Sequence, residues 1–139
     1  MGGFTLPFFG IGGMHMTIQN ALERLDSLKY NTYTDSEKIT WLDRLDRTVK
    51  AQVIDTHEGG VAVPFAGYSA DTAMDTALLI PAPYDEAYIH YLAAQIDFAN
   101  GEFDKYNAEI TMYNTLYTAY AAAYNREHMP VTAVRRMLF

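Results

Sequence analysis

The stretch from Phe103 to Glu127 reads FDKYNAEITMYNTLYTAYAAAYNRE, and its spacing decides the fold. Large apolar residues recur in it at alternating steps of three and four, which keeps one side of an α-helix against a partner. A second apolar row, Met112, Leu116, Ala119 and Ala123, widens this stripe. Such a helix is roughly 37 Å long, at about 1.5 Å per residue. The main row consists of Phe103, Tyr106, Ile110, Tyr113, Tyr117, Tyr120 and Tyr124.

The residues just before this stretch predict an antiparallel partner helix. Pro83 suits the first helical position, and Asp85 and Glu86 complement the positive end of the helix dipole. Asn100-Gly101 predicts its C-terminal cap, and the short link makes the two helices antiparallel neighbours. The side expected to face the long helix consists of Tyr84, Tyr88, Tyr91, Leu92, Gln95, Phe98 and Ala99. The opposite side consists of Glu86, His90, Ala93 and Asp97.

Two more helices are predicted nearer the N-terminus. The first runs from Ile18 to Leu28 with Thr17 as its N-cap, and Thr34-Asp35-Ser36-Glu37 is a capping box that starts the second, which runs to about Thr56. The inward residues of the first are Ile18, Ala21, Leu22, Leu25 and Leu28. Those of the second are Ile39, Leu42, Leu45, Val49 and Val53. Its solvated or subunit-contacting face is expected to carry Asp43, Arg44, Asp46, Arg47 and Lys50.

The segment from His57 to Pro83 breaks the helical pattern with repeated glycine and proline. Val61–Phe65 and Leu78–Ile80 are candidates for short extended pieces. The apolar content of this long connection favours packing against a partner, or a small hairpin, over disorder. The sequence thus predicts an all-α, four-helix domain over residues 17–129 with a loop at 57–83. A flexible glycine-rich arm (residues 1–16) precedes this domain and a tail (residues 130–139) follows it.

Composition excludes several classes of protein. The chain has 139 residues, half of them apolar, and no cysteine, which removes disulfides, thiol nucleophiles and cysteine-based metal sites. A net charge of −7 argues against binding nucleic acid through its phosphates. No apolar run is long enough for a membrane span. The arm lacks the basic start of a signal peptide. It is interpreted either as an artificial addition or the product of an upstream start codon, with the true start at Met14 or Met16, or as an arm that packs onto a neighbouring subunit only after assembly.

Motifs for chemistry are missing from the sequence. The histidines His15, His57, His90 and His128 share no metal-ligand spacing, and His90 is expected to form a surface ion pair with Glu86. Neither a GxSxG elbow nor a phosphate-binding loop occurs. The 11 tyrosines are interpreted as core and interface residues, because a tyrosine ring buries area while its hydroxyl stays wet. We therefore expect no enzyme and no cofactor.

Several motifs carry a resemblance to a known family. They are PAPYDE at 81–86, NGE at 100–102 with Asp104, Tyr106 and Asn107 after it, and YNR at 124–126 with HMP at 128–130. The segment from Thr17 to Glu58, with TDSEK at 34–38 and Trp41, is similar too. Over residues 17–130 the chain resembles the small head-tail connector, or adaptor, proteins of tailed bacteriophages and prophages.

The resemblance implies a helical subunit of the virion that assembles as a ring, usually twelvefold, beneath the portal protein. The ring extends the DNA channel without binding DNA specifically and offers a surface to the next connector or tail protein. An acidic channel lining would let DNA slide. Portal-binding residues are then expected in the tail, at Val134, Arg135, Arg136, Met137, Leu138 and Phe139. The loop residues expected to reach a neighbouring subunit or the channel are Val61, Val63, Phe65, Tyr68, Asp71 and Asp75.

Two alternatives stay open at this stage. One is a helical protein–protein adaptor unrelated to phage assembly, such as a dimeric regulatory module, which a two-fold assembly would indicate. The other is an enzyme or small-ligand binder that uses the tyrosine-lined side of the long helix, which requires a buried polar pocket there.

Overall fold

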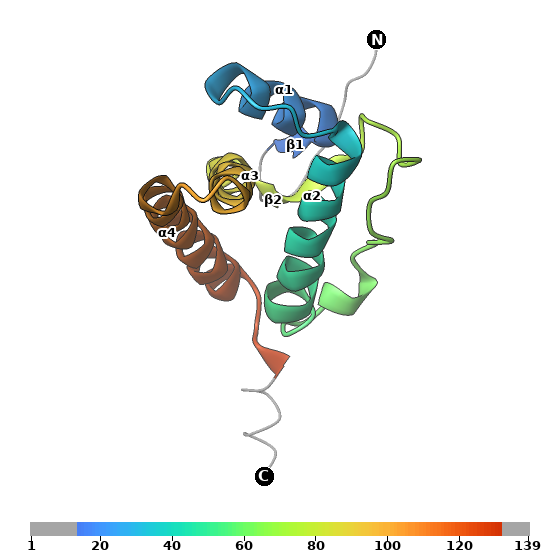
Figure 1. The fold of residues 1–139 in the computed structure, drawn as a ribbon. Helices are drawn as coiled ribbons and strands as arrows, with labels where there is room; N and C mark the ends of the chain where they lie inside the picture. Colours follow the sequence, from blue (N-terminus) through green and yellow to red (C-terminus); the bar gives the residue numbers. More distant parts are fainter. Residues whose placement is uncertain (1–13, 132–139) are drawn as a thin grey trace.

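The computed structural model describes residues 14–131, and the fold is mostly helical, as predicted (Figure 1). The four α-helices are α1 (Ile18–Leu28), α2 (Asp35–Val49), α3 (Glu86–Ala99) and α4 (Phe103–Glu127). A π-helical turn, η1 (Lys50–Ile54), and a 3-10 turn, η2 (Gly60–Ala62), follow α2. The two short strands are β1 (His15–Thr17) and β2 (Ala77–Pro81). The predicted bounds of the first and last helices match those of α1 and α4, whereas Pro83, predicted at the first helical position, lies in the turn before α3, which begins at Glu86.

Both N-terminal helices begin at the caps that the sequence predicts. The Thr17 side chain accepts a hydrogen bond from the backbone N–H of Asn20, and the Asn20 side chain accepts one from the N–H of Thr17. Thr34 and Glu37 form the same reciprocal pair at the start of α2. Each cap satisfies amide groups that a helix leaves unpaired at its first turn.

The second helix is shorter than predicted as a regular α-helix. α2 ends at Val49, and the chain continues through η1 to Ile54. Val53, predicted to point inward, is buried within this turn. The helical direction therefore persists almost to the predicted end, with one wider turn in place of the last α-turn.

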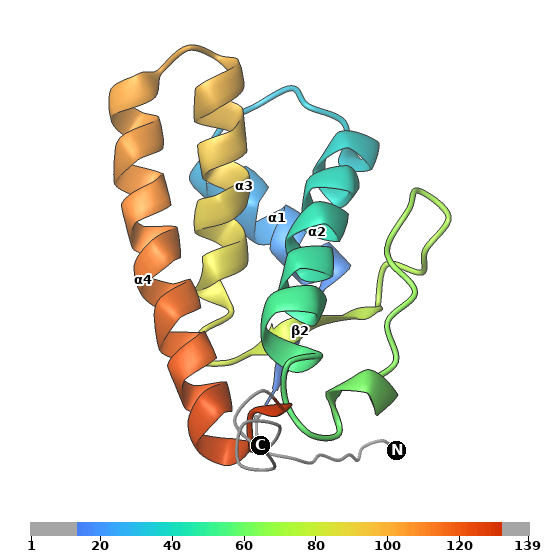
Figure 2. The same ribbon diagram turned by 90° about the horizontal axis from the view of Figure 1, so that it is seen from below.

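Helices α3 and α4 lie side by side and antiparallel, as the short link predicts (Figure 2). Gly101 adopts φ 74° in the link, a left-handed conformation that glycine accepts without strain. Aromatic rings pair along the contact, with 5.3 Å between the ring centres of Tyr91 and Tyr113 and 6.2 Å between those of Tyr84 and Tyr120. The predicted aromatic contact between the two helices is therefore present.

The extended piece predicted at Leu78–Ile80 is real, but its partner lies elsewhere than expected. β2 pairs antiparallel with β1, which lies just before α1, so the hairpin predicted within the loop does not form. Val61–Phe65 forms no strand either, because Val61 and Ala62 belong to the turn η2. β1 also includes His15 and Met16 of the predicted arm. Pairing with β1 leaves both Leu78 and Ile80 buried beneath the helices, which a hairpin at the tip of the loop would not achieve.

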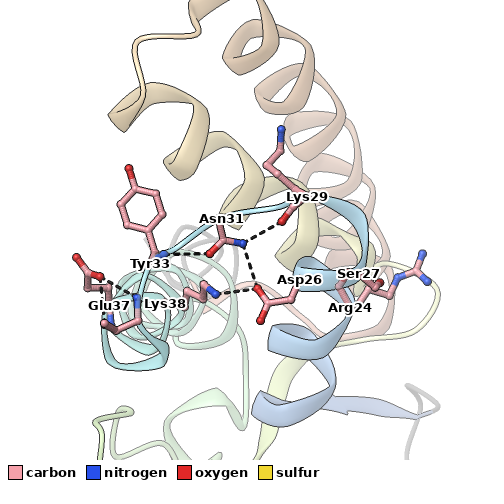
Figure 3. A network of polar contacts seen from close by, with 9 residues as sticks. Arg24, Asp26, Ser27, Lys29, Asn31, Tyr33, Glu37 and Lys38 are labelled. Atoms are coloured by element: carbon pink, nitrogen blue, oxygen red, sulfur yellow. Dashed lines mark hydrogen bonds and ion pairs between the residues drawn. The ribbon is translucent and has the colours of Figure 1, made fainter.

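Polar contacts fix the connection between α1 and α2 (Figure 3). The Asn31 amide donates to Asp26 Oδ1 and to the carbonyl of Lys29, and its own oxygen accepts from the N–H of Tyr33. The buried Lys38 of α2 lies 2.7 Å from the same Asp26 oxygen. These contacts hold the two helices at a fixed angle around the core.

The first helix buries four of its five predicted inward residues. Leu28 is the exception and is 63% exposed, because it lies in the last turn beyond the core residues. The remaining four are Ile18, Ala21, Leu22 and Leu25.

Candidate assembly surfaces

A buried carboxylate joins the long loop, strand β2 and helix α3 to helix α2. Asp46 is fully buried, and its Oδ1 accepts a hydrogen bond of 2.7 Å from the hydroxyl of Tyr88. Its Oδ2 accepts from the hydroxyl of Tyr68 and from the backbone N–H of Leu79. The Tyr88 hydroxyl in turn accepts from the N–H of Ile80, 2.7 Å away. One side chain thus holds three separate segments in place.

The environment of Asp46 also changes its acidity. Burial raises the pKa of its carboxyl from 3.8 to about 6, although the hydrogen bonds from Tyr68, Tyr88 and Leu79 act in the opposite direction. The prediction that Asp46 lies on the solvated or subunit-contacting face of the second helix is wrong. Asp46 lies four residues after Leu42, so it shares the inward face, and its hydrogen-bond partners make its burial tolerable.

The loop is held against its own chain at further points. Asp43 accepts from the N–H of Tyr68 and pairs with Arg47, whose guanidinium lies 6.0 Å from the ring centre of Phe65. At Gly67, with φ 86°, an added Cβ would lie 2.3 Å from the Arg47 side chain. The loop between α2 and β2 is therefore a shaped element, and glycine at this position lets it approach α2 closely.

A second set of contacts joins the end of α4 to the residues after η1. His57 is buried, its Nδ1 lies 2.6 Å from the carbonyl oxygen of Val53, and its Nε2 lies 3.1 Å from Asn125 Oδ1. The N–H of Glu58 donates to the carbonyl of Met129, and the N–H of Val131 donates to that of Thr56. The chain therefore leaves the described fold at a fixed place, beside the start of the loop.

Helix α4 presents an outward face without charge. Among its 25 residues only Tyr120 is buried, and the sequence from Ile110 to Asn125 contains no Asp, Glu, Lys or Arg. The residues on the side of α4 that is turned away from α3 are small and exposed, and Met112 beside them is 49% exposed. We call this the α4 face; it comprises Ala108, Thr111, Met112, Thr115, Thr118, Ala119 and Ala122.

A second uncharged surface lies on the loop. Residues 59–70 contain no charged side chain, and Val61 is 82% exposed. We call the exposed part the loop face; it comprises Val61, Ala62, Pro64, Ala66, Ser69 and Ala70. In Figures 1 and 2 the loop lies on one side of the molecule and α4 on the other, with α2 and α3 between them.

The predicted loop residues divide into two groups. Val61, Asp71 and Asp75 are exposed, whereas Val63 and Phe65 are half-buried and Tyr68 is buried on Asp46. Tyr68 therefore cannot contact a neighbouring subunit in this arrangement. The remaining five stay candidates for an interface or channel.

The predicted core of the helix pair is buried unevenly. Leu92 and Tyr120 are buried, and so is Tyr88, but its hydroxyl is directed to Asp46 of α2 and Ile80 of β2 and not to α4 as predicted. Phe103 is 56% exposed, with its ring 5.7 Å from that of Phe98 at the tip of the hairpin. The others are half-buried: Tyr84, Tyr91, Tyr106, Ile110, Tyr113, Tyr117 and Tyr124. The predicted portal-binding residues, Val134 to Phe139, lie outside the described residues.

The prediction of a polar, outward side for the third helix is wrong for two of its four residues. Asp97 and Ala93 are buried, because α1 and α2 cover α3 on the side away from α4. Asp97 pairs there with Lys29 at 2.9 Å. His90 pairs with Glu109 of α4 at 2.6 Å, while its expected partner Glu86 pairs with Arg24. Helical spacing predicts only contacts within one helix, whereas the partners of Asp97, His90 and Glu86 come from other segments of the chain.

Sequence reasoning also missed the roles of His57 and Lys38. His57 stands in a loop-like stretch, and Asn125, which lies beside its Nε2, comes 68 positions later, so no local signal reveals this contact. Lys38 falls in the first turn of α2 beside the buried Ile39, and only the pairing with Asp26 accounts for its burial.

Comparison with protein-family models, curated proteins and solved structures finds no match for this chain. Among residues 14–131, no three His, Asp or Glu side chains gather as a metal site requires. No helix within that range is both long and apolar enough to cross a membrane.

Proposed function

We propose that this protein is a structural subunit, without catalytic activity, of the head-tail connector ring of a tailed bacteriophage. In this proposal it docks on the portal at the head-tail interface, extends the DNA channel and receives the next connector or tail protein. The single observation that carries the proposal is the α4 face. A long exposed helix face without charge is unusual on a chain of net charge −7, and it suits contact with further protein.

The charge of the chain favours self-association through uncharged surfaces over contact elsewhere. Copies that each carry −7 repel one another, so they approach at the lowest cost where charges are absent. Contacts through tyrosine, threonine and alanine also avoid the cost of removing water from charged groups. The resemblance over residues 17–130 gives this self-association its specific form, a ring beneath the portal.

The proposed portal contact lies in residues 132–139. The contacts of Met129 and Val131 with the segment after η1 give every subunit the same starting point for this tail. Arg135 and Arg136 stand among Val134, Met137, Leu138 and Phe139, a composition that fits an anchor in a groove of a partner. The DNA would pass an acidic ring without sticking to it.

The test uses DNA-filled heads that carry a portal but lack this subunit. Purified protein is mixed with the heads, the heads are sedimented, and the bound copies are counted. We expect saturable binding at a fixed number of copies per head, and none on heads without the portal. A chain ending at Val131 keeps the contacts of Met129 and Val131 and is expected not to bind. Failure of the folded full-length protein to bind would overturn the proposal.

A further inference from the structure

We propose that neighbouring copies meet through two different surfaces, the α4 face of one copy and the loop face of the next. This inference rests on the proposed function, because it specifies how the ring would close. The occupant of each face is a second copy of this chain, and the contact is head-to-tail rather than face-to-face.

The position of the two faces favours this arrangement. They lie on opposite sides of the molecule, separated by α2 and α3 (Figure 2). A ring needs each subunit to offer one surface to the neighbour on its left and another to the neighbour on its right. A contact between two α4 faces would use up that surface in a two-fold dimer and leave the loop face uncovered.

Charge sets these two faces apart from the exposed surfaces of α1 and α2. α2 exposes Asp35, Glu37, Arg44 and Arg47, and α1 exposes Glu23 and Arg24. Charges stand at the borders of the two faces, at Asp104, Lys105 and Arg126 on α4 and at Arg47, Glu58 and Asp71 beside the loop face. Since each copy carries −7, pairing two uncharged surfaces brings copies together with the least repulsion and desolvation.

The loop face is also presented in a fixed shape. Tyr68 is tied to Asp46 beneath it, and Phe65 lies over the Arg47 guanidinium. A loop already ordered in the free subunit loses little further conformational freedom on binding. The α4 face consists largely of alanine and threonine, so a neighbouring chain can approach the helix closely and few flexible side chains need ordering.

The absence of cysteine makes a direct test practical. Two single-thiol variants are made, Thr115→Cys on the α4 face and Ala66→Cys on the loop face, and one of them is isotopically labelled. They are mixed, loaded on portal-bearing heads and treated with a short bismaleimide. Ser36→Cys, on the exposed charged start of α2, replaces each of them in turn as the matched control.

The inference predicts one pattern of products identified by mass spectrometry. In the mixture of Thr115→Cys and Ala66→Cys, linked chains should join a labelled copy to an unlabelled one. This mixed product should be absent when either variant is loaded alone or when Ser36→Cys replaces one of the two. Thr115→Cys chains that link efficiently to one another would overturn the inference in favour of a two-fold contact. Variants that load on heads but give no mixed product would overturn it while leaving the proposed function intact. Failure of the folded wild-type chain to load on the same heads counts against the proposed function itself.

Discussion

Helices α3 and α4 look alike in sequence but occupy opposite positions in the molecule. Both are rich in tyrosine and alanine and begin with acidic residues, yet α3 buries 8 of its 14 residues and α4 buries only Tyr120 of 25. α3 contacts α1, α2 and α4, while α4 contacts α3 and η1. An apolar stripe therefore does not say whether its partner lies within the chain or outside it. Here α3 uses its surface for folding, whereas most of the surface of α4 is left uncovered within the single chain.

Replacing one tyrosine on each helix by alanine is expected to give the largest difference between α3 and α4, measured as the loss in the free energy of unfolding. Tyr88→Ala on α3 removes a fully buried ring and takes their hydrogen-bond partner from Asp46 Oδ1 and the N–H of Ile80, at a cost of about 3–5 kcal/mol in the free energy of unfolding. Tyr113→Ala on α4 removes a half-buried ring and should cost roughly 1–2 kcal/mol. Urea denaturation of both variants measures the difference. Equal losses would mean that α4 contributes to the core as much as α3 does.

The buried carboxylate of Asp46 should make the stability of the fold depend on pH. Because burial raises the pKa of Asp46 from 3.8 to about 6, the folded protein holds a proton between these values that the unfolded chain has lost. The contribution of Asp46 to stability therefore falls as the pH rises from about 4 to about 6, by up to about 3 kcal/mol.

Asp46→Asn removes this titration and serves as the comparison. Both proteins keep Asp26 and Asp43, whose pKa values lie below the ordinary one because slight burial is outweighed by hydrogen bonds to Lys38 and Arg47. The difference between wild type and Asp46→Asn therefore isolates Asp46. Denaturation at pH 4.5 and pH 7.5, values chosen roughly to bracket the shift, should show the wild type losing more stability on going to high pH. Parallel curves would mean that Asp46 does not titrate in this way.

A charge placed on the α4 face should have the smallest effect on stability. Thr118 is exposed on a helix, so Thr118→Arg is expected to change the free energy of unfolding by less than about 0.5 kcal/mol. The same variant should lose binding to portal-bearing heads. Thr40→Arg places an equal charge on the exposed, already charged side of α2 and should bind as the wild type does. Normal binding by Thr118→Arg would exclude the α4 face from assembly.

Local signals are sufficient to predict much of this fold. The capping residues Thr17 and Thr34 and the spacing from Phe103 to Glu127 predict helix bounds correctly, because caps and periodicity act over a few residues. The predictions for Asp46 and Asp97 are wrong, because charge argues for exposure and the partners that make their burial tolerable lie far away in sequence. The pairing of β1 with β2 escapes prediction for the same reason.

The candidate surfaces are predictable only in part. Exposure of Val61 and the apolar spacing of α4 follow from the sequence. The outward face of α4 stays uncovered and lies across the molecule from the loop. This arrangement depends on how α2 and α3 fill the space between α4 and the loop. No spacing within a single element contains that information.

The most direct test of the central claim follows the exposure of Met112 by hydroxyl-radical footprinting. Met112 lies on the α4 face and is 49% exposed in the single chain, whereas Tyr30 is 89% exposed and lies outside both uncharged faces. When the subunit is bound to portal-bearing heads, we predict strong protection of Met112 and unchanged modification of Tyr30. Met112 modified in head-bound subunits as fast as in the free protein would contradict the assignment of α4 as the assembly helix.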